Sequence, residues 1–412
     1  MKRLLLLCAL VIPCFMACEK MDEAVSPDVE QQQDPVQSYV MRVAEEGIAM
    51  LGDAETRAVR RHIDPNRIKP CITTATRSGE SDTLYYVVNF ADSAGFALVA
   101  ADSTSPAPLL AVTEQGNYTP GEVTNTGFDD YISLLSSPRG RIDTIINTPP
   151  PTYDIEIIER YVLTIDPMIP VKWGQGPPFN QRCDTYAVNP IKKYPVGCVA
   201  VAIAQLFAYH KQPTLYTITY NTTYLNSYPN WEEINAHVIC NTTFGCRIDT
   251  SIATLMREIG HRANMDYTEE GSGTSMNEAR NCMFDFGYSV NQLQPLDYAV
   301  LTSELQAGRP VIMSGDRLSA DNEYIGHAWV ADGAKHLQRI VNHYEGSVLV
   351  DSQQTTIPYI HYNWGFTGNY DGYFLYNVFA LKNGIDYDIA GGAATNDYRY
   401  NVDMLTGISY NQ

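Results

Sequence analysis

The sequence has few positive charges for its length and no cluster of them. Its 412 residues contain 28 Lys and Arg against 47 Asp and Glu, which gives a formal net charge of −19 at pH 7. Nucleic acids and anionic lipid surfaces bind proteins through clustered Lys and Arg side chains. The composition therefore excludes both as expected partners, and we expect no nucleic-acid binding.

The sequence lacks the C-x-x-C spacing of a zinc site between any two of its cysteines. We therefore expect no metal and no cofactor. Nine cysteines are present, three of them within the first 18 residues. Among the other six, Cys240 and Cys246 flank a short Asn-Thr-Thr-Phe-Gly loop, and in an oxidising compartment they are the candidate disulfide pair.

Long hydrophobic runs are absent apart from one at the start of the chain. Two basic residues precede an apolar run over residues 4–16, which is too short for a stable membrane span. Residues 1–18 therefore have the pattern of an export signal that is removed. The segment Phe15-Met16-Ala17-Cys18 resembles a bacterial lipobox, which predicts lipidation of Cys18 and a cell-envelope lipoprotein. A plain signal peptide, with a secreted product, is the alternative.

The rest of the chain has the composition of a folded protein with more than one domain. Hydrophobic residues make up 45% of the sequence, and 412 residues exceed the usual length of one domain. An acidic, Gln-rich stretch and a Pro149-Pro-Pro segment are typical of a tether and a linker. We divide the sequence into an export signal (1–18), a tether (19–37), a first folded unit (38–135), a linker (136–158) and a second folded unit (159–412).

Hydrophobic periodicity predicts a mixture of helices and strands in both units. The first unit reads as a small α+β unit, with helices over 36–50 and 127–135 around strands at 83–90, 95–102 and 109–113. In the second unit, residues 214–247 read as irregular. Helices over 248–263, 275–286 and 303–307 precede strands at 311–314, 327–333, 339–344, 347–350, 359–365, 371–374 and 400–405. Helices followed by an antiparallel sheet indicate an α+β fold.

Cys198 lies where a tight turn meets a helix. Pro195 and Gly197 form the turn, and good helix formers continue from Cys198 until Pro213 ends them. The free N–H groups and dipole at a helix N-terminus stabilise an anion, so we expect a lowered thiol pKa and a reactive thiolate. A cysteine buried in an apolar helix is the alternative, because residues 199–208 are almost entirely apolar.

A cysteine nucleophile needs a base and a group that orients the base. His327 opens a predicted strand after Gly326, and Asn363 precedes Trp364 and Gly365. The side-chain carbonyl of Asn363 could accept a hydrogen bond from an imidazole and fix its orientation. The alternatives are an ordinary strand histidine and a turn asparagine. The order Cys, His, Asn, with the second and third far downstream, is that of papain-like proteases.

Three segments resemble those of the streptopain family of bacterial cysteine peptidases. They are Tyr-Pro-Val-Gly-Cys-Val-Ala-Val-Ala-Ile-Ala-Gln at 194–205, Gly-His-Ala-Trp-Val-Ala-Asp-Gly at 326–333 and Tyr-Asn-Trp-Gly-Phe at 362–366. Residues 80–135 also resemble the family's inhibitory propeptide. The resemblance implies a papain-like fold with two lobes, one helical with the Cys helix and one antiparallel β lobe with His and Asn, preceded by a small α+β prodomain.

The resemblance also implies a role for each site residue. Cys198 would be the nucleophile, His327 the base and later the acid, and Asn363 the group that orients His327. Trp364 would shield that hydrogen bond from water, and Gln175 would join the Cys198 N–H in the oxyanion hole. These roles imply a secreted or surface-anchored cysteine endopeptidase that hydrolyses protein or peptide substrates through an acyl-enzyme intermediate.

The same resemblance implies how the enzyme is activated, and the export signal indicates where it is located. The prodomain would inhibit its own enzyme until the linker is cleaved, so the chain would be a zymogen that is exported. It would end as an outer-membrane or cell-surface lipoprotein, or as a secreted enzyme after processing. One departure concerns residues 315–326, which are longer and more charged than the family's glycine-rich loop, so its substrate preference does not transfer.

Two other functions fit parts of the pattern. A transglutaminase-like acyl transferase shares the Cys and His but usually has Asp as its third residue, so Asn363 argues against it. A catalytically silent binding or inhibitor protein on the same scaffold is the second alternative. It is disfavoured because each candidate catalytic position has a chemically competent residue.

Overall fold

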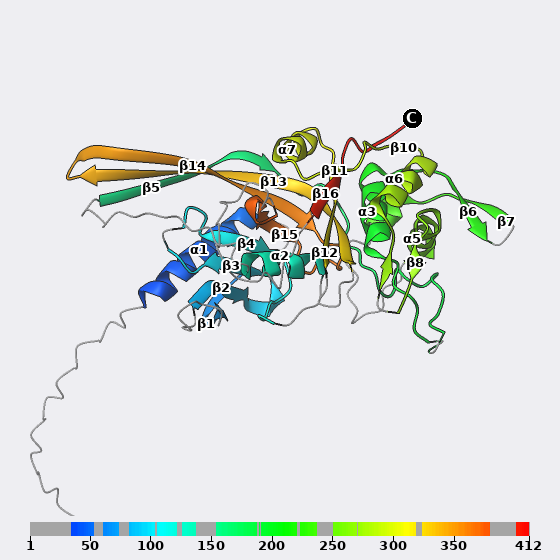
Figure 1. The fold of residues 1–412 in the computed structure, drawn as a ribbon, viewed down its shortest axis with the longest axis horizontal. Coiled ribbons are helices and arrows are strands. Elements are labelled where there is room, and N and C mark those ends of the chain that lie inside the picture. The colour runs from blue at the N-terminus through cyan, green and yellow to red at the C-terminus, as the bar shows by residue number, and fades with distance from the viewer. Residues whose placement is uncertain are drawn as a thin grey trace, which may run out of the picture.

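The architecture was taken from a computed structural model, drawn in Figure 1. It describes residues 34–52, 61–73, 82–103, 105–121, 126–136, 154–187, 189, 191–220, 223–236, 250–269, 271–318, 324–379 and 401–411. The predicted export signal, lipidation site Cys18, tether up to residue 33 and disulfide Cys240–Cys246 lie outside the described residues. Within them, no helix is both long enough and apolar enough to cross a membrane.

One antiparallel sheet runs through most of the described chain. Its order is β1-β2-β3-β4-β15-β14-β13-β12-β16-β11, and β5 pairs with β13. The strands are β1 (Ile63–Thr73), β2 (Asp82–Phe90), β3 (Phe96–Ala100), β4 (Leu109–Thr113), β5 (Asp154–Ile165), β11 (Gln294–Pro295), β12 (Val311–Leu318), β13 (Tyr324–Glu345), β14 (Val348–Asn363), β15 (Gly372–Leu375) and β16 (Asn401–Leu405). The first four strands therefore continue the sheet of the late strands through the β4–β15 pair.

The N-terminal unit consists of β1–β4 with the helices α1 (Pro35–Leu51) and α2 (Thr126–Ser136). Asp34 caps α1 by accepting a hydrogen bond from the Val36 N–H. The apolar face of α1 is buried, and every residue of β3 and β4 is buried as well. Their core is continuous with that of β12–β15, so the N-terminal unit and the late sheet bury their apolar surface together.

A second hydrophobic core forms the helical lobe around α3 (Cys198–His210). Ten consecutive residues of α3 are buried, as the apolar run predicts. Lys211 adopts a left-handed conformation with φ 54°, which ends the helix just before Pro213. Around α3 lie α4 (Trp231–Ala236), α5 (Thr250–Arg262) and α6 (Met276–Asp285). Figure 1 shows α3, α5 and α6 together at the right.

Smaller elements complete the fold. The helix α7 (Tyr298–Gln306) packs on β12 and β13. Three two-stranded sheets pair β6 (Tyr216–Tyr220) with β7 (Thr223–Ser227), β8 (Asp266–Tyr267) with β9 (Ser272–Gly273), and β10 (Tyr288–Ser289) with β17 (Ser409–Tyr410). Short 3-10 turns occupy Ala91–Ser93 (η1) and Tyr376–Val378 (η3). The long β13–β14 hairpin and β5 extend together at the left of Figure 1.

The predicted α+β class is confirmed, but several local predictions were wrong. Residues 214–247 were expected to be irregular, yet β6, β7 and α4 lie there. The strands expected at 327–333 and 339–344 are one strand, β13, because β14 pairs with it from Val330 to Glu345 and so bridges the expected gap. The helix expected at 303–307 is α7, which begins earlier, and β5 begins inside the predicted linker.

Candidate active site

Cys198 is the first residue of α3, as the turn and helix pattern predicts. The preceding Gly197 has φ 90°, and a Cβ there would lie 2.8 Å from Met265 Sδ and 2.9 Å from the Ser272 carbonyl oxygen. Only glycine fits this position without displacing its neighbours. The Val196 N–H donates to the Gln175 carbonyl at 3.0 Å, so the segment that carries Gln175 lies beside the approach to Cys198.

Strand β13 brings its start to the Cys198 sulfur. The Ala328 N–H donates to Cys198 Sγ at 3.3 Å, so the residue that follows His327 touches the thiol. The start of β13 and the first residue of α3 therefore meet at the Cys198 sulfur. His327 is 5% exposed and stacks at a ring-centroid distance of 6.2 Å on Trp329.

The imidazole of His327 is hydrogen-bonded to a backbone carbonyl and not to Cys198 or Asn363. Its Nε2 donates to the Trp364 carbonyl at 3.1 Å, and it forms no hydrogen bond with Cys198 Sγ or Asn363 Oδ1. Asn363 Oδ1 instead accepts from the Gly365 N–H at 3.0 Å, and its Nδ2 donates to the Val171 carbonyl at 3.2 Å. The three side chains are thus neighbours that are not joined into a hydrogen-bonded triad.

The first turn of α2 explains why the imidazole is held there. A Cβ on Gly127 would lie 2.5 Å from His327 Cδ2 and 2.7 Å from Trp364 Cε3. The backbone of α2 therefore rests directly on both rings, and only a glycine allows that approach. The N-terminal unit covers the candidate site through this contact.

Burial reverses the electrostatics expected for the thiol. We expected the helix N-terminus to lower the Cys198 pKa. Instead, desolvation raises it, although the N–H groups of Ala328, Val199 and Cys198 act in the opposite direction. Burial also lowers the pKa of His327 to about 4, against which the Trp364 carbonyl acts weakly. Both groups are neutral at pH 7, so no thiolate–imidazolium pair exists in this form.

Trp364 is fully buried in an aromatic cluster. Its ring lies 5.2 Å from that of Trp329 and 5.3 Å from that of Phe374, measured between centroids. Its backbone N–H donates to Asp371 Oδ1 at 2.9 Å. The tryptophan therefore holds a rigid position beside His327. Its carbonyl contacts the imidazole, and its ring packs on Trp329.

A charged cluster beneath the site was not predicted as functional. His361 Nδ1 bonds to Asp332 Oδ1 at 2.6 Å, and its Nε2 lies 3.4 Å from Glu114 Oε1. Glu114 also forms an ion pair with Lys172. His361 and Asp332 belong to the His-Tyr-Asn and Ala-Trp-Val-Ala-Asp-Gly segments, which was the only sequence signal for them.

This cluster makes a pH prediction for the uncut chain. Burial acts to lower the His361 pKa, but Asp332 and Glu114 outweigh it and raise the pKa to about 10. A raised pKa contributes stability that is complete below the unfolded value near 6.5 and is lost as pH rises toward 10. The measurement uses uncut chains that all carry Cys198→Ala. Between pH 7 and 10, the Tm should fall more in the chain that keeps His361 than in the chain with His361→Gln. The control is His261→Gln, an exposed histidine on α5, and an equal fall in all three would contradict the assignment.

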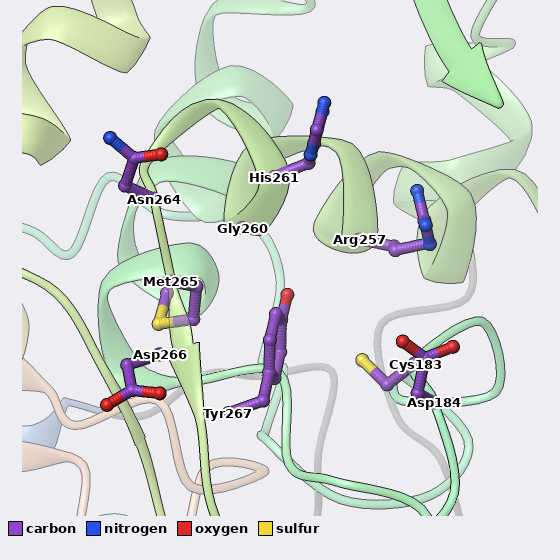
Figure 2. Close-up of a pocket in the computed structure, with 9 residues that line it drawn as sticks. All are labelled: Cys183, Asp184, Arg257, Gly260, His261, Asn264, Met265, Asp266 and Tyr267. Carbon is purple, nitrogen blue, oxygen red and sulfur yellow. The ribbon is translucent and has the colours of Figure 1, made fainter. Parts of the chain in front are cut away.

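A pocket on the helical lobe lies apart from these residues. Figure 2 shows this cavity of about 440 Å³, formed by the loop before α3, the end of α5 and β8. Neither Cys198 nor His327 lines this pocket. Met265 lines it and also lies against Gly197, so it stands between the pocket and the turn before Cys198. Burial raises the pKa of Cys183, which does line it, to about 11. Cys183 is therefore protonated at neutral pH and is a poor nucleophile.

The fold and the site together define a class. A cysteine at the mouth of a buried helix, facing an antiparallel sheet that carries His and Asn, is the arrangement of a papain-like cysteine peptidase. The N-terminal unit, which packs on His327 and Trp364 through Gly127, corresponds to a prodomain.

Comparisons with known proteins agree with this class. The Peptidase C10 family model matches residues 173–374, a span that includes all the candidate site residues. The thiol protease/hemagglutinin PrtT of Porphyromonas gingivalis is 23% identical over 368 residues, covering 79% of this chain and 37% of PrtT. Streptopain of Streptococcus pyogenes is 26% identical over 324 residues, covering 70% of this chain and 73% of streptopain. The chain thus spans well under half of PrtT.

A solved structure extends the likeness to the N-terminal unit. A fragment of prointerpain A from Prevotella intermedia superposes with a TM-score of 0.53 at 22% identity, covering 85% of this chain and 100% of that fragment. Such a similarity supports the fold, prodomain included. The match to the peptidase C10 family model and the similarity to streptopain support a cysteine peptidase of the streptopain type, and the fold has the architecture of such a peptidase with its prodomain.

Proposed function

We propose that this chain is an exported cysteine endopeptidase, made as a zymogen, with Cys198 as its nucleophile. The observation that carries the proposal is the 3.3 Å hydrogen bond from the Ala328 N–H to Cys198 Sγ. It supports a catalytic pair because it puts His327 one residue from the sulfur, so a change of side-chain conformation suffices to bring the imidazole to it.

Activation, on this proposal, begins with cleavage in the linker and departure of α2. His327 loses its contact with Gly127, leaves the Trp364 carbonyl and turns toward Cys198 and Asn363. Water then reaches the site, and the desolvation that raised the thiol pKa and lowered the imidazole pKa is relieved. The proton passes from Cys198 to His327, and the helix N-terminus stabilises the thiolate.

The chemistry follows from these groups. Cys198 Sγ attacks the peptide carbonyl carbon, and the resulting oxyanion receives hydrogen bonds from the Cys198 N–H and the Gln175 amide. His327 gives its proton to the leaving amine, which departs and leaves an acyl-enzyme. His327 then takes a proton from water, the water attacks the thioester, and Cys198 is released with the second product. Asn363 orients His327, and Trp364 shields that hydrogen bond.

The same proposal places the enzyme outside the cytoplasm. Residues 1–18 have the pattern of an export signal, and Cys18 has the position of a lipobox cysteine. The residues up to 33 would then tether the zymogen to the cell envelope, and cleavage in the linker would release the peptidase from the tether.

An epoxide that traps cysteine peptidases tests the nucleophile. Peptide mass spectrometry of the matured enzyme should find one epoxide adduct, on Cys198, with peptidase activity lost in proportion to labelling. Cys183 and Cys282 serve as internal controls, because burial raises their thiol pKa values to about 11 and about 12. An adduct on either of them, or activity that survives complete labelling of Cys198, would contradict the proposal.

A further inference from the structure

Three groups outside the catalytic set lie around the segment that carries Asn363 and Trp364. Lys172 follows Val171, whose carbonyl accepts the Asn363 amide, and His361 precedes Asn363 by two residues on β14. Asp371 receives the Trp364 N–H at 2.9 Å. Because strand neighbours two apart share a face, the charge on His361 lies on the same side of β14 as Asn363. Their charges therefore bear on the geometry of this segment.

Glu114 supplies a carboxylate to this cluster from the prodomain. It pairs with Lys172 and lies 3.4 Å from His361, and its N–H donates to the Asp371 carbonyl at 2.8 Å. Burial acts to raise the Glu114 pKa, but His361 and Lys172 lower it overall, so Glu114 is ionised. When the prodomain leaves, Lys172 loses the partner of its charge.

Asp371 is the carboxyl group that remains. It is 1% exposed, and only its Oδ1 is used, by Trp364; Oδ2 is buried and has no hydrogen-bond partner among the described residues. Burial raises the Asp371 pKa to about 7, while the positive charge of Lys172 is the largest influence in the other direction. A half-satisfied buried carboxyl beside a lysine about to lose its partner is arranged to accept that lysine.

The stem of Lys172 already lies on the loop that carries Asp371. A Cβ on Gly368 would lie 2.5 Å from Lys172 Cδ, so the lysine stem crosses this loop in van der Waals contact. The Thr367 N–H donates to the Trp173 carbonyl at 2.9 Å, which joins the same loop to the segment after Lys172. Lys172 therefore needs only to redirect its terminal ammonium group.

We propose that Asp371 is a positioning residue of the matured enzyme, which takes Lys172 over from Glu114 when the prodomain leaves. The Lys172–Asp371 pair then fixes the loop against the segment 171–173. Through the Trp364 N–H and the Val171 carbonyl it holds Trp364 and Asn363 in place for His327. This inference rests on the proposed function of Cys198, His327 and Asn363.

Kinetics of the matured enzyme test the exchange. Asp371→Asn keeps the hydrogen-bond acceptor for Trp364 but removes the charge, and Lys172→Met keeps the stem but removes the ammonium. Each should lower kcat by about 10-fold to 100-fold with KM changed by less than about twofold, because displaced catalytic groups cost rate more than binding. The double variant should be no slower than the slower single variant, since both remove one pair.

Glu114→Gln is the matched control, since it removes a charge from the same cluster. Its matured enzyme should have the wild-type kcat and KM, because Glu114 is discarded with the prodomain. If Asp371→Asn keeps kcat within about twofold of the wild type, or if the two single effects multiply in the double variant, the proposal is overturned. Should Asp371→Asn fail to fold, Lys172→Met alone must show the loss of kcat, and an unchanged kcat would be equally decisive.

A crystal structure of the matured enzyme gives a readout that does not depend on rate. Lys172 Nζ should lie within about 4 Å of an Asp371 carboxylate oxygen, the ordinary ion-pair distance. A lysine that points into solvent would overturn the proposal. Failure of the proposed function is recognised separately, because the wild-type enzyme would then have no peptidase activity for any variant to change.

Discussion

Cys198→Ala should abolish peptidase activity, with a loss of about 10⁴-fold or more, and should leave the chain uncut at the linker. Removal of the nucleophile in enzymes of this kind leaves only the contribution of binding and the oxyanion hole. Activity on a fluorogenic peptide and the mass of the purified protein measure the two effects. The result assumes that no other protease is present, so the protein is produced in a host without one that cuts the linker.

Cys183→Ala is the matched control for this variant. Cys183 is a buried cysteine of the helical lobe, and it lines the pocket in Figure 2 rather than the candidate site. Its replacement should cost about 1–3 kcal/mol of stability at most and should leave maturation and activity intact. Maturation of Cys198→Ala at the wild-type rate, or loss of activity in Cys183→Ala with its fold retained, would contradict the assignment of the nucleophile.

Gly127→Val should make the uncut precursor about 10-fold to 100-fold more reactive toward the epoxide. The valine Cβ would lie 2.5 Å from His327 Cδ2 and 2.7 Å from Trp364 Cε3, which no packing tolerates. Overpacking of this kind costs about 1–3 kcal/mol, and relief comes by lifting α2 off the site. Each 1.4 kcal/mol changes the open population about tenfold. Labelled full-length protein at short times, seen by mass spectrometry, measures the effect.

Ser133→Ala is the control on the same helix, because Ser133 is exposed and its hydroxyl donates to the Asp129 carbonyl within α2. Its precursor should react with the epoxide at the wild-type rate. Equal reactivity of Gly127→Val and the wild type, with α2 still folded, would mean that α2 does not control access to Cys198. A faster reaction in both variants would point to general loosening of the prodomain instead.

Local patterns predicted the parts of the site that depend on local structure. Gly197 and Pro213 bracket the helix that begins at Cys198, and the structure has α3 at Cys198–His210. The strand at 109–113 was predicted to the residue, because a short apolar run bounded by turns has few alternatives. The candidate nucleophile, His327 and Asn363 were predicted from residue type, order and resemblance, and the structure brings the backbone beside His327 to the thiol.

Contacts between distant segments could not be predicted in this way. The pairing of β4 with β15 joins residues 109–113 to 372–375, and nothing in either strand specifies the other. The thiol pKa was predicted from the helix N-terminus alone, whereas desolvation by burial decides its direction. Glu114 and Asp371 were missed for the same reason, since an acidic residue in a loop has no signal until its buried partners are known.

The distance between Cys198 Sγ and the nearest imidazole nitrogen of His327 in the matured enzyme is the most direct measurement. A crystal structure should place the two atoms within hydrogen-bond reach, about 3–4 Å, with the second nitrogen on Asn363 Oδ1 and the Trp364 carbonyl released. An imidazole that still donates to the Trp364 carbonyl in a fully active enzyme, without contact to the sulfur, would contradict His327 as the base and α2 as the cause of latency.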